Sequence, residues 1–299
     1  MTPDLTFEPN APIGVFDSGL GGLTVVSQMM RLLPGERILF VADQAHVPYG
    51  GRELSEVCGF ACGISEGLLR AGCKAIVMAC NISSATALPT VQAKHPNSLV
   101  LGVIEPGARA AVRTTANGRI GVLTTAGTAR SAAYTRTLYA LDPALFVLEV
   151  PCPDFVPLVE ADAITTPAAL HAAECYLAPL LDAGTDTVVL GCTHYPFLLP
   201  VLQKIAPNVR FVNPAEQTVI ELAREIEDRR MVARVARPEP HCLTTTGDTT
   251  QFDTQLHRFL PPSAQPFRVA AARWKAGELG IEDTERSFPE ADRRLAERG

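Results

Sequence analysis

Short runs of apolar, mostly β-branched residues alternate along the chain with longer segments in which apolar residues recur every three or four positions. Near-continuous apolar runs are typical of strands buried on both faces of a parallel sheet, and the longer period is that of a helix. The pattern therefore predicts an α/β fold. Helices such as 51–72 separate the predicted strands, which cover 13–16, 37–42, 74–79, 98–104, 119–124, 144–150, 186–191 and 209–213.

The second half of the chain repeats the first. Residues 68–80 (LLRAGCKAIVMAC) align without gaps with residues 180–192 (LLDAGTDTVVLGC), 112 positions later, and Gly14 recurs as Gly121, 107 positions later. Strands in the same order at nearly constant spacing indicate two copies of one supersecondary unit. We therefore predict two pseudo-symmetric, doubly wound α/β domains with mainly parallel sheets and an active site in the cleft between them.

The repeat also predicts where the domains begin and end. Residues 1–106 together with 215–272 form the first predicted domain, and residues 107–214 form the second. The segment 241–248 (HCLTTTGD) predicts a late strand and turn that rejoin the first domain. Residues 273–299 are charged and weakly apolar, so we expect a C-terminal extension that is a solvated tail or a surface helix.

The composition is that of a soluble globular protein, with 47% hydrophobic residues, 19% charged residues and a net charge of -6. An acidic chain has no electrostatic footprint for nucleic acid or for an anionic membrane surface. Neither a signal peptide nor a membrane span is evident. We expect a cytoplasmic protein that acts on a small molecule without nucleic-acid or membrane partners, with a homodimer as a possible assembly.

In the cytoplasm the eight cysteines are expected to be reduced thiols, and their spacing does not form a zinc site. Most free cysteines are small buried hydrophobes. That interpretation is the simplest for six of the eight, namely Cys58, Cys62, Cys73, Cys152, Cys175 and Cys242.

Cys80 and Cys192 differ because each closes a predicted strand and precedes a predicted helix. A helix N-terminus favours the thiolate, which is expected to lower the thiol pKa toward neutrality, where a thiol can serve as acid or base. Since the repeat relates the two cysteines, we expect them to approach one ligand from opposite faces. Inversion at a carbon needs that geometry. The alternative is that both merely pack at strand ends.

Asp17 and His194 lie next to these thiols in the predicted layout. Asp17 ends an apolar strand, where a carboxylate needs a partner, so it is expected to accept a proton from Cys80 or to bind a substrate ammonium group. Alternatively, it caps the following helix. His194 lies two residues beyond Cys192 and is expected to hold or orient the proton of that thiol.

Polar groups beside the two cysteines suit an α-carboxylate. Asn81, Ser83 and Thr193, with neighbouring backbone N–H groups, lie at predicted helix starts, which bind anions. Such a site also stabilises the charge that builds up as an α-proton leaves. There are no clustered metal ligands and no lysine in a Schiff-base context, so we expect neither metal nor other cofactor. The residues indicate a cofactor-independent amino-acid racemase.

At these residues the chain closely resembles bacterial glutamate racemases of the aspartate/glutamate racemase superfamily. The resemblance implies two pseudo-symmetric domains, a cleft site and interconversion of L- and D-glutamate, which supplies D-glutamate for peptidoglycan. The matching blocks follow the family order over roughly residues 12–260: FDSGLGGLTV (16–25), ADQAHVPYG (42–50), ACNISS (79–84), GVIEPG (102–107), TTAGTARSAAY (124–134), LGCTHYPFLLP (190–200) and TTGD (245–248).

The resemblance also implies roles for single residues. Cys80 and Cys192 would be the catalytic thiols, with Asp17 assisting the first, and His194 and Glu160 the second. The family usually has Cys-Asn-Thr where this chain has Ile82 in the third position, so a hydroxyl is lost although the Ile82 N–H remains. Substrate contacts are implied at Asp17, Ser18, Tyr49, Gly50, Asn81, Ile82, Thr125, Thr128, Thr193 and His194.

Other functions fit parts of the sequence. A related racemase could act on another acidic amino acid such as aspartate. A hydrolase could use Cys192 and His194 as nucleophile and base, although this leaves Cys80 and the repeat without a role. A nucleotide-binding dehydrogenase would use the Gly-rich turn after residue 16, with Asp43 as the ribose-binding acid, but the glycine fingerprint is incomplete. A non-catalytic amino-acid-binding protein would need no paired thiols.

Overall fold

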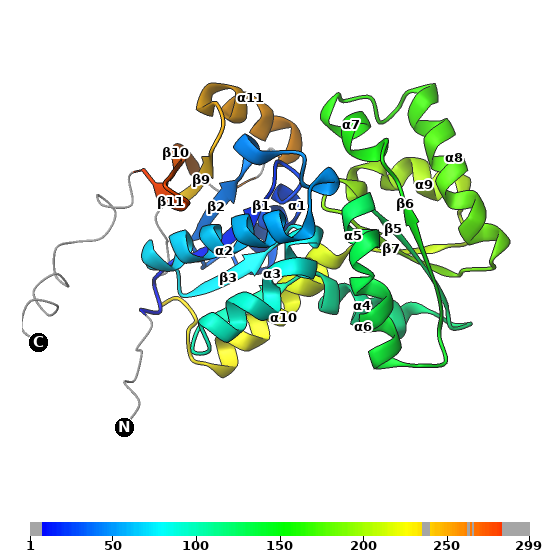
Figure 1. The fold of residues 1–299 in the computed structure, drawn as a ribbon, viewed down its shortest axis with the longest axis horizontal. Coiled ribbons are helices and arrows are strands. Elements are labelled where there is room, and N and C mark those ends of the chain that lie inside the picture. The colour runs from blue at the N-terminus through cyan, green and yellow to red at the C-terminus, as the bar shows by residue number, and fades with distance from the viewer. Residues whose placement is uncertain (1–7, 235–239, 262–263, 265, 283–299) are drawn as a thin grey trace, which may run out of the picture.

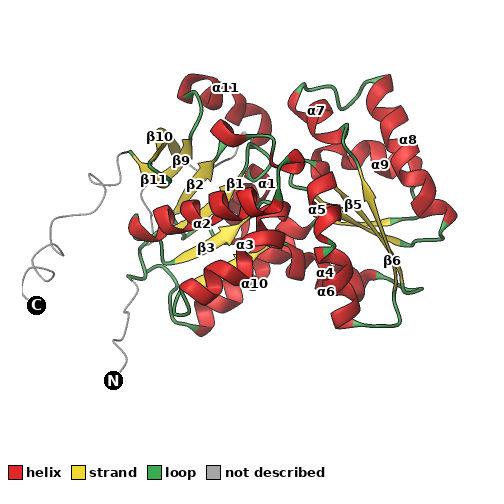
Figure 2. Cartoon of the chain, in the orientation of Figure 1, coloured by secondary structure: helices red, strands yellow, loops and turns green. Residues whose placement is uncertain are grey.

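The computed structural model describes residues 8–234, 240–261, 264 and 266–282, and it contains two sheets that lie side by side with helices packed against them (Figures 1 and 2). The larger sheet has the strand order β11-β10-β9-β2-β1-β3-β4. Its strands are β1 (Ile13–Asp17), β2 (Ile38–Ala42), β3 (Ala75–Met78), β4 (Leu99–Gly102), β9 (His241–Thr245), β10 (Phe267–Lys275) and β11 (Glu278–Ile281).

The smaller sheet is fully parallel and has the strand order β6-β5-β7-β8. This order matches that of β2-β1-β3-β4 in the larger sheet, so the two halves have the same topology. The predicted fold class is confirmed. The strands are β5 (Arg119–Thr124), β6 (Phe146–Pro151), β7 (Thr187–Gly191) and β8 (Arg210–Val212).

Helices follow most of the strands, as the apolar periodicity predicts. Around the larger sheet these are α1 (Leu23–Leu32), α2 (Leu54–Arg70), α3 (Asn81–Lys94), α10 (Pro214–Asp228) and α11 (Thr249–Phe259). Helix α4 (Ile104–Thr114) connects the larger sheet to the smaller one. The helices between the strands of the smaller sheet are α5 (Ala126–Ser131), α6 (Ala133–Leu141), α7 (Phe155–Glu160), α8 (Pro167–Asp182) and α9 (Leu199–Ile205). The strand expected over 98–104 is shorter, because its last residues already form the start of α4.

The sequence repeat has a packing basis. A Cβ atom on Gly14 would lie 3.1 Å from a Leu68 methyl group, and one on Gly121 would lie 2.8 Å from a methyl group of Leu180. Leu68 and Leu180 are equivalent in the repeat. In each half, the glycine in the first strand leaves room for a leucine of the corresponding helix, α2 or α8. A side chain at either glycine would overfill the core.

The chain returns to the larger sheet after α10. Strand β9 pairs in parallel with β2, as predicted for 241–248, and β10 pairs in parallel with β9. The expected solvated tail or surface helix from residue 273 is wrong for its first part. Arg273 continues β10, and β11 folds back antiparallel to it, because main-chain hydrogen bonding extends the sheet. Residues 283–299 lie outside the described part.

The eight cysteines are free thiols. Cys73, Cys152 and Cys242 are buried, as the hydrophobe interpretation predicts, whereas Cys58 and Cys62 are only half-buried. For Cys175 that interpretation is wrong: it lies on the solvent side of α8 and is exposed. Within the described ranges, no helix is long and apolar enough to cross a membrane.

Candidate active site

A cavity of about 700 Å³ lies at the carboxyl ends of the strands of both sheets. Ligands bind at this edge of parallel sheets because the loops there vary without disturbing the strands. The residues that the family resemblance assigned to catalysis or substrate binding line this cavity. These residues are Asp17, Ser18, Tyr49, Gly50, Cys80, Asn81, Ile82, Thr125, Thr128, Glu160, Cys192, Thr193 and His194. Ser83, also predicted to face the carboxylate, is fully buried and does not line the cavity.

Cys80 is the N-cap residue of α3 and follows β3, as predicted. Its Sγ lies 3.9 Å from the hydroxyl of Ser18. The expected lowering of its pKa is wrong. Burial, with the negative charge of nearby Asp17, raises the pKa of the Cys80 thiol to about 12, despite hydrogen bonds from Ser83 and Ser18 that oppose the shift. The thiol is therefore protonated at neutral pH.

Asp17 ends β1 and is almost completely buried. Its Oδ2 accepts hydrogen bonds from the backbone N–H of Gly22, at 2.6 Å, and from the hydroxyl of Thr193, at 3.1 Å. The first contact holds the turn before α1, and the second reaches the smaller sheet. Burial raises the pKa of Asp17, although the charge of His194 and a hydrogen bond with Cys80 act in the opposite direction.

Cys192 follows β7, the counterpart of β3, but its surroundings differ from those of Cys80. The predicted helix does not begin directly after it. A 3₁₀ turn, η3 (Tyr195–Leu198), intervenes before α9. The polar partner of the thiol is a side chain, because the Nδ1 atom of His194 lies 3.9 Å from the Cys192 Sγ.

His194 connects Cys192 to Glu160 at the end of α7. Its Nε2 lies 3.2 Å from Oε1 of Glu160, whose pKa this hydrogen bond lowers. Burial opposes the imidazolium, but the contacts with Cys192 and Glu160 outweigh it and raise the pKa of His194 to about 10. A protonated imidazole beside Cys192 stabilises negative charge on that sulfur.

Side chains from both sheets surround the space between the thiols. Asn81 lies in the first turn of α3, and its Oδ1 accepts a hydrogen bond of 2.7 Å from Tyr134, so its amide nitrogen carries the donors left for a ligand. Thr125 is the N-cap of α5 and accepts from the backbone N–H of Thr128. These helix starts supply N–H and hydroxyl donors of the kind that bind a carboxylate.

Ile82 adds apolar surface to the same wall. It is 3% exposed and packs with Tyr49, Val57 and Cys80. On its far side it approaches α5 closely, because a Cβ atom on Gly127 would lie only 2.3 Å from the Ile82 δ-carbon. Ile82 therefore fills a place where a smaller polar side chain would leave space.

Sequence reasoning missed an apolar part of the cavity lining. Its members follow β2 or β6: Val47, Pro48, Cys152, Pro153, Val156 and Pro157. Cys152 was assigned to the core, although its place at the end of a predicted strand could have indicated this edge of the sheet. In the part of the chain that the structure covers, no three His, Cys, Asp or Glu side chains are grouped as metal ligands.

Comparison with known proteins identifies the family. The sequence model of the family described as Asp/Glu/Hydantoin racemase matches residues 13–222. The chain belongs to this racemase family. A glutamate racemase from Corynebacterium kroppenstedtii is 41% identical over 274 residues, which cover 85% of this chain and 95% of that protein.

Solved glutamate racemase structures have the same fold as this chain. Glutamate racemase from Bacillus anthracis superposes with a TM-score of 0.84 at 35% identity, covering 91% of this chain and 100% of the other. Glutamate racemase from Francisella tularensis, solved in complex with D-glutamate, gives a TM-score of 0.82 at 30% identity and covers 89% and 98% of the two chains. The protein is thus an isomerase, as its motifs indicated.

Proposed function

We propose that the protein interconverts L- and D-glutamate without a cofactor, using Cys80 and Cys192 as a pair of opposed acid and base. The observation that carries this proposal is the position of the two thiols. They end equivalent strands of two sheets with the same topology, and both line one cavity. Relatives that are named glutamate racemases, one of them solved with D-glutamate, support glutamate as the substrate.

In the proposed reaction each thiol serves one face of the substrate Cα. The sulfur of the deprotonated cysteine takes the Cα proton and becomes a thiol, and the electron pair of the C–H bond moves into the carboxylate. The opposite thiol then gives its proton to the other face of Cα and becomes a thiolate. Configuration is inverted, no proton is gained or lost overall, and the reverse reaction uses the same two groups with their roles exchanged.

The surroundings of the thiols favour one starting state. Cys80 is protonated because burial and Asp17 raise its pKa to about 12, so it is ready as the acid. Cys192 is assigned the role of base, because the cationic His194 side chain lies 3.9 Å from its sulfur. Glu160 keeps His194 protonated through its hydrogen bond. Asp17 is assigned the corresponding role of proton partner on the Cys80 side, or of partner to the substrate ammonium group.

Donors between the thiols hold the α-carboxylate in this proposal. The Asn81 amide, the backbone N–H groups at the start of α3 and the Thr193 hydroxyl are suitably placed on the cavity wall. Hydrogen bonds to the carboxylate become stronger as the Cα proton leaves, because charge accumulates on its oxygens. We further propose that the product serves peptidoglycan synthesis in the cytoplasm.

A hydrolase is the other chemistry that this geometry could support, because Cys192, His194 and Glu160 line up as nucleophile, base and orienting acid. Such a reaction leaves no task for Cys80. Release of ammonia from L-glutamine, or of alcohol from glutamate esters, tests it directly, and we expect neither.

The decisive experiment is incubation of the protein with L-glutamate in D₂O without added cofactor. We expect D-glutamate to form with deuterium at Cα, at a rate that falls at least a thousandfold in Cys80→Ala and in Cys192→Ala. Cys175→Ala is the matched control, since this exposed thiol lies away from the cavity and its loss should leave the rate unchanged. Near-normal turnover in either cavity variant would refute the two-thiol mechanism, and turnover of aspartate alone would refute the substrate.

A further inference from the structure

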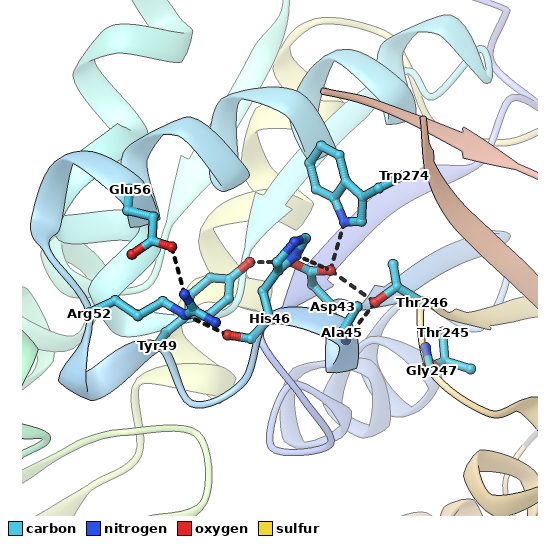
Figure 3. Close-up of polar contacts among 10 residues, drawn as sticks. All are labelled: Asp43, Ala45, His46, Tyr49, Arg52, Glu56, Thr245, Thr246, Gly247 and Trp274. Carbon is cyan, nitrogen blue, oxygen red and sulfur yellow. Dashed lines mark hydrogen bonds and ion pairs between the residues drawn. The ribbon is translucent and has the colours of Figure 1, made fainter. Parts of the chain in front are cut away.

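Asp43, directly after β2, is a completely buried carboxylate with hydrogen-bonding partners on both oxygens (Figure 3). Its Oδ2 accepts from the Tyr49 hydroxyl at 2.6 Å and lies 2.9 Å from Nδ1 of His46. Its Oδ1 accepts from the Trp274 indole N–H at 2.8 Å and from the Thr246 hydroxyl at 2.9 Å. Asp43 therefore joins several side chains through one acceptor group.

These partners come from three parts of the chain. Two belong to the connection after β2, which contains the short turns η1 (Gln44–His46) and η2 (Tyr49–Gly51). Thr246 follows β9 and accepts a further hydrogen bond of 2.9 Å from the backbone N–H of Ala45. Trp274 belongs to β10, in the region where the sequence predicted a solvated tail. Asp43 thus ties this connection to two later strands.

Aromatic packing fixes the same group of residues. The His46 ring stacks on Phe60 of α2 with a centroid distance of 4.0 Å, and Trp274 meets the His46 ring edge-on at 5.4 Å. Trp274 also packs tightly on α2, because a Cβ atom on Gly63 would lie 2.8 Å from its ring. The indole N–H therefore has little freedom to turn away from Asp43.

The connection that Asp43 secures also forms part of the cavity wall. Residues 47–51, here named the cavity loop, line the cavity without interruption, whereas Asp43 itself does not. Tyr49 contributes to the lining, but its hydroxyl is used by Asp43. That contact leaves its ring, and the backbone at Gly50, to meet a ligand.

We propose that Asp43 is a positioning residue, which holds the cavity loop in the shape that binds the substrate, and that Trp274 of β10 anchors Asp43 in turn. This inference rests on the proposed function of the cavity. The carboxylate is suited to this task because it accepts several hydrogen bonds and donates none. Asp43 lies where a dehydrogenase would place a ribose-binding acid, but its oxygens are already used within the protein.

The test replaces Asp43 by asparagine, which keeps the shape but turns one acceptor oxygen into an NH₂ donor facing other donors. We expect KM for L- and D-glutamate to rise about tenfold, with kcat within about threefold, because a displaced cavity loop weakens binding of substrate and transition state alike. Tyr49→Phe removes one donor and keeps the ring, and Trp274→Phe removes the indole N–H and keeps an aromatic side chain, so smaller rises in KM are expected from both.

Two controls separate positioning from general stability. Asp186 is a comparable hub outside the cavity, with hydrogen bonds from the Thr115 hydroxyl and the backbone N–H of Ala116, both at 2.6 Å. Asp186→Asn should lower the unfolding temperature and leave KM unchanged. In addition, amide hydrogen exchange of peptides covering 44–52 should accelerate in Asp43→Asn without substrate, whereas exchange in β1 should not change.

The outcomes are distinct. The proposal is overturned if Asp43→Asn leaves KM within twofold of the parent protein, or if Asp186→Asn raises KM to the same extent. It is also overturned if exchange in peptides covering 44–52 is unaltered. If the parent protein does not interconvert glutamate, the proposed function fails, and the exchange experiment still decides whether Asp43 holds the cavity loop.

Discussion

Replacing Ile82 by threonine tests how the cavity wall sets affinity for the substrate. The side chain lies in the first turn of α3, next to the backbone N–H groups assigned to the α-carboxylate. It is 3% exposed and packs against Tyr49 and Val57 on one side and against α5 at Gly127 on the other. A threonine hydroxyl would add one donor at the carboxylate and remove apolar packing from the wall.

The magnitudes of the two effects can be worked out separately. Threonine loses two buried carbon positions, and at about 0.8 kcal/mol per buried methylene the free energy of unfolding should fall by about 2 kcal/mol once the buried hydroxyl is included. A hydrogen bond to a charged carboxylate contributes about 1.5–3 kcal/mol. Because about 1.4 kcal/mol corresponds to a factor of ten, KM for glutamate should fall tenfold or more.

Ile82→Val is the matched control, since valine has the shape of threonine without the hydroxyl. Chemical denaturation should show both variants to be less stable than the parent protein. Coupled assays of D- and L-glutamate formation should show a low KM only for threonine. Equal KM values in the threonine and valine variants would refute the reasoning, because the backbone N–H groups would then suffice for the carboxylate.

Three further changes test other parts of the structure. Glu160→Gln removes the carboxylate that helps to raise the pKa of His194 to about 10, so the His194 pKa should fall. The alkaline limb of the kcat–pH profile should then move to lower pH. An unmoved limb would contradict the assignment of His194 as the partner of Cys192. Asp17→Asn should slow racemisation and yet raise the thermal unfolding temperature at pH 7. Burial raises the pKa of Asp17 in the folded state, so the ionised carboxylate makes the folded protein less stable as the pH rises above its unfolded pKa. A lower unfolding temperature in the variant would contradict this direction of the pKa shift. Gly121→Ala should lower the free energy of unfolding by about 1–3 kcal/mol through overlap with Leu180. The double variant Gly121→Ala/Leu180→Ala should lose less free energy of unfolding than the sum of the two single losses, because the smaller side chain at 180 removes the overlap. Denaturation of both single variants and of the double variant measures this, and strictly additive losses would contradict it.

Much of the fold could be predicted from the sequence because its determinants are local. Apolar runs such as 119–124 match β5, and the 68–80/180–192 repeat predicted the common topology of the two sheets. The prediction failed for residues 273–282, the described part of the expected tail. There the end of β10 is stabilised by antiparallel main-chain pairing with β11 and by Trp274 packing on α2, and a charged sequence carries no trace of either contact.

The membership of the site followed from the sequence, but its electrostatics did not. Cys80 and Cys192 were recognised as a pair through the repeat, and their strand-end positions predicted a shared cavity. The direction of the Cys80 pKa shift was predicted wrongly, since a helix start by itself favours the thiolate. Burial beside Asp17, which depends on the complete tertiary structure, outweighs that effect.

The sequence by itself determined the strands, the repeat and the chemical types of the site residues, because periodicity and motifs are properties of neighbouring positions. Only the tertiary structure decided how far each ionisable group is removed from water and what lies beside it. Desolvation and charge pairing act through space, so they keep the Cys80 thiol protonated at neutral pH and make an imidazolium of His194. The same holds for Asp43, which is one acid among many in the sequence and a buried hub in the folded chain.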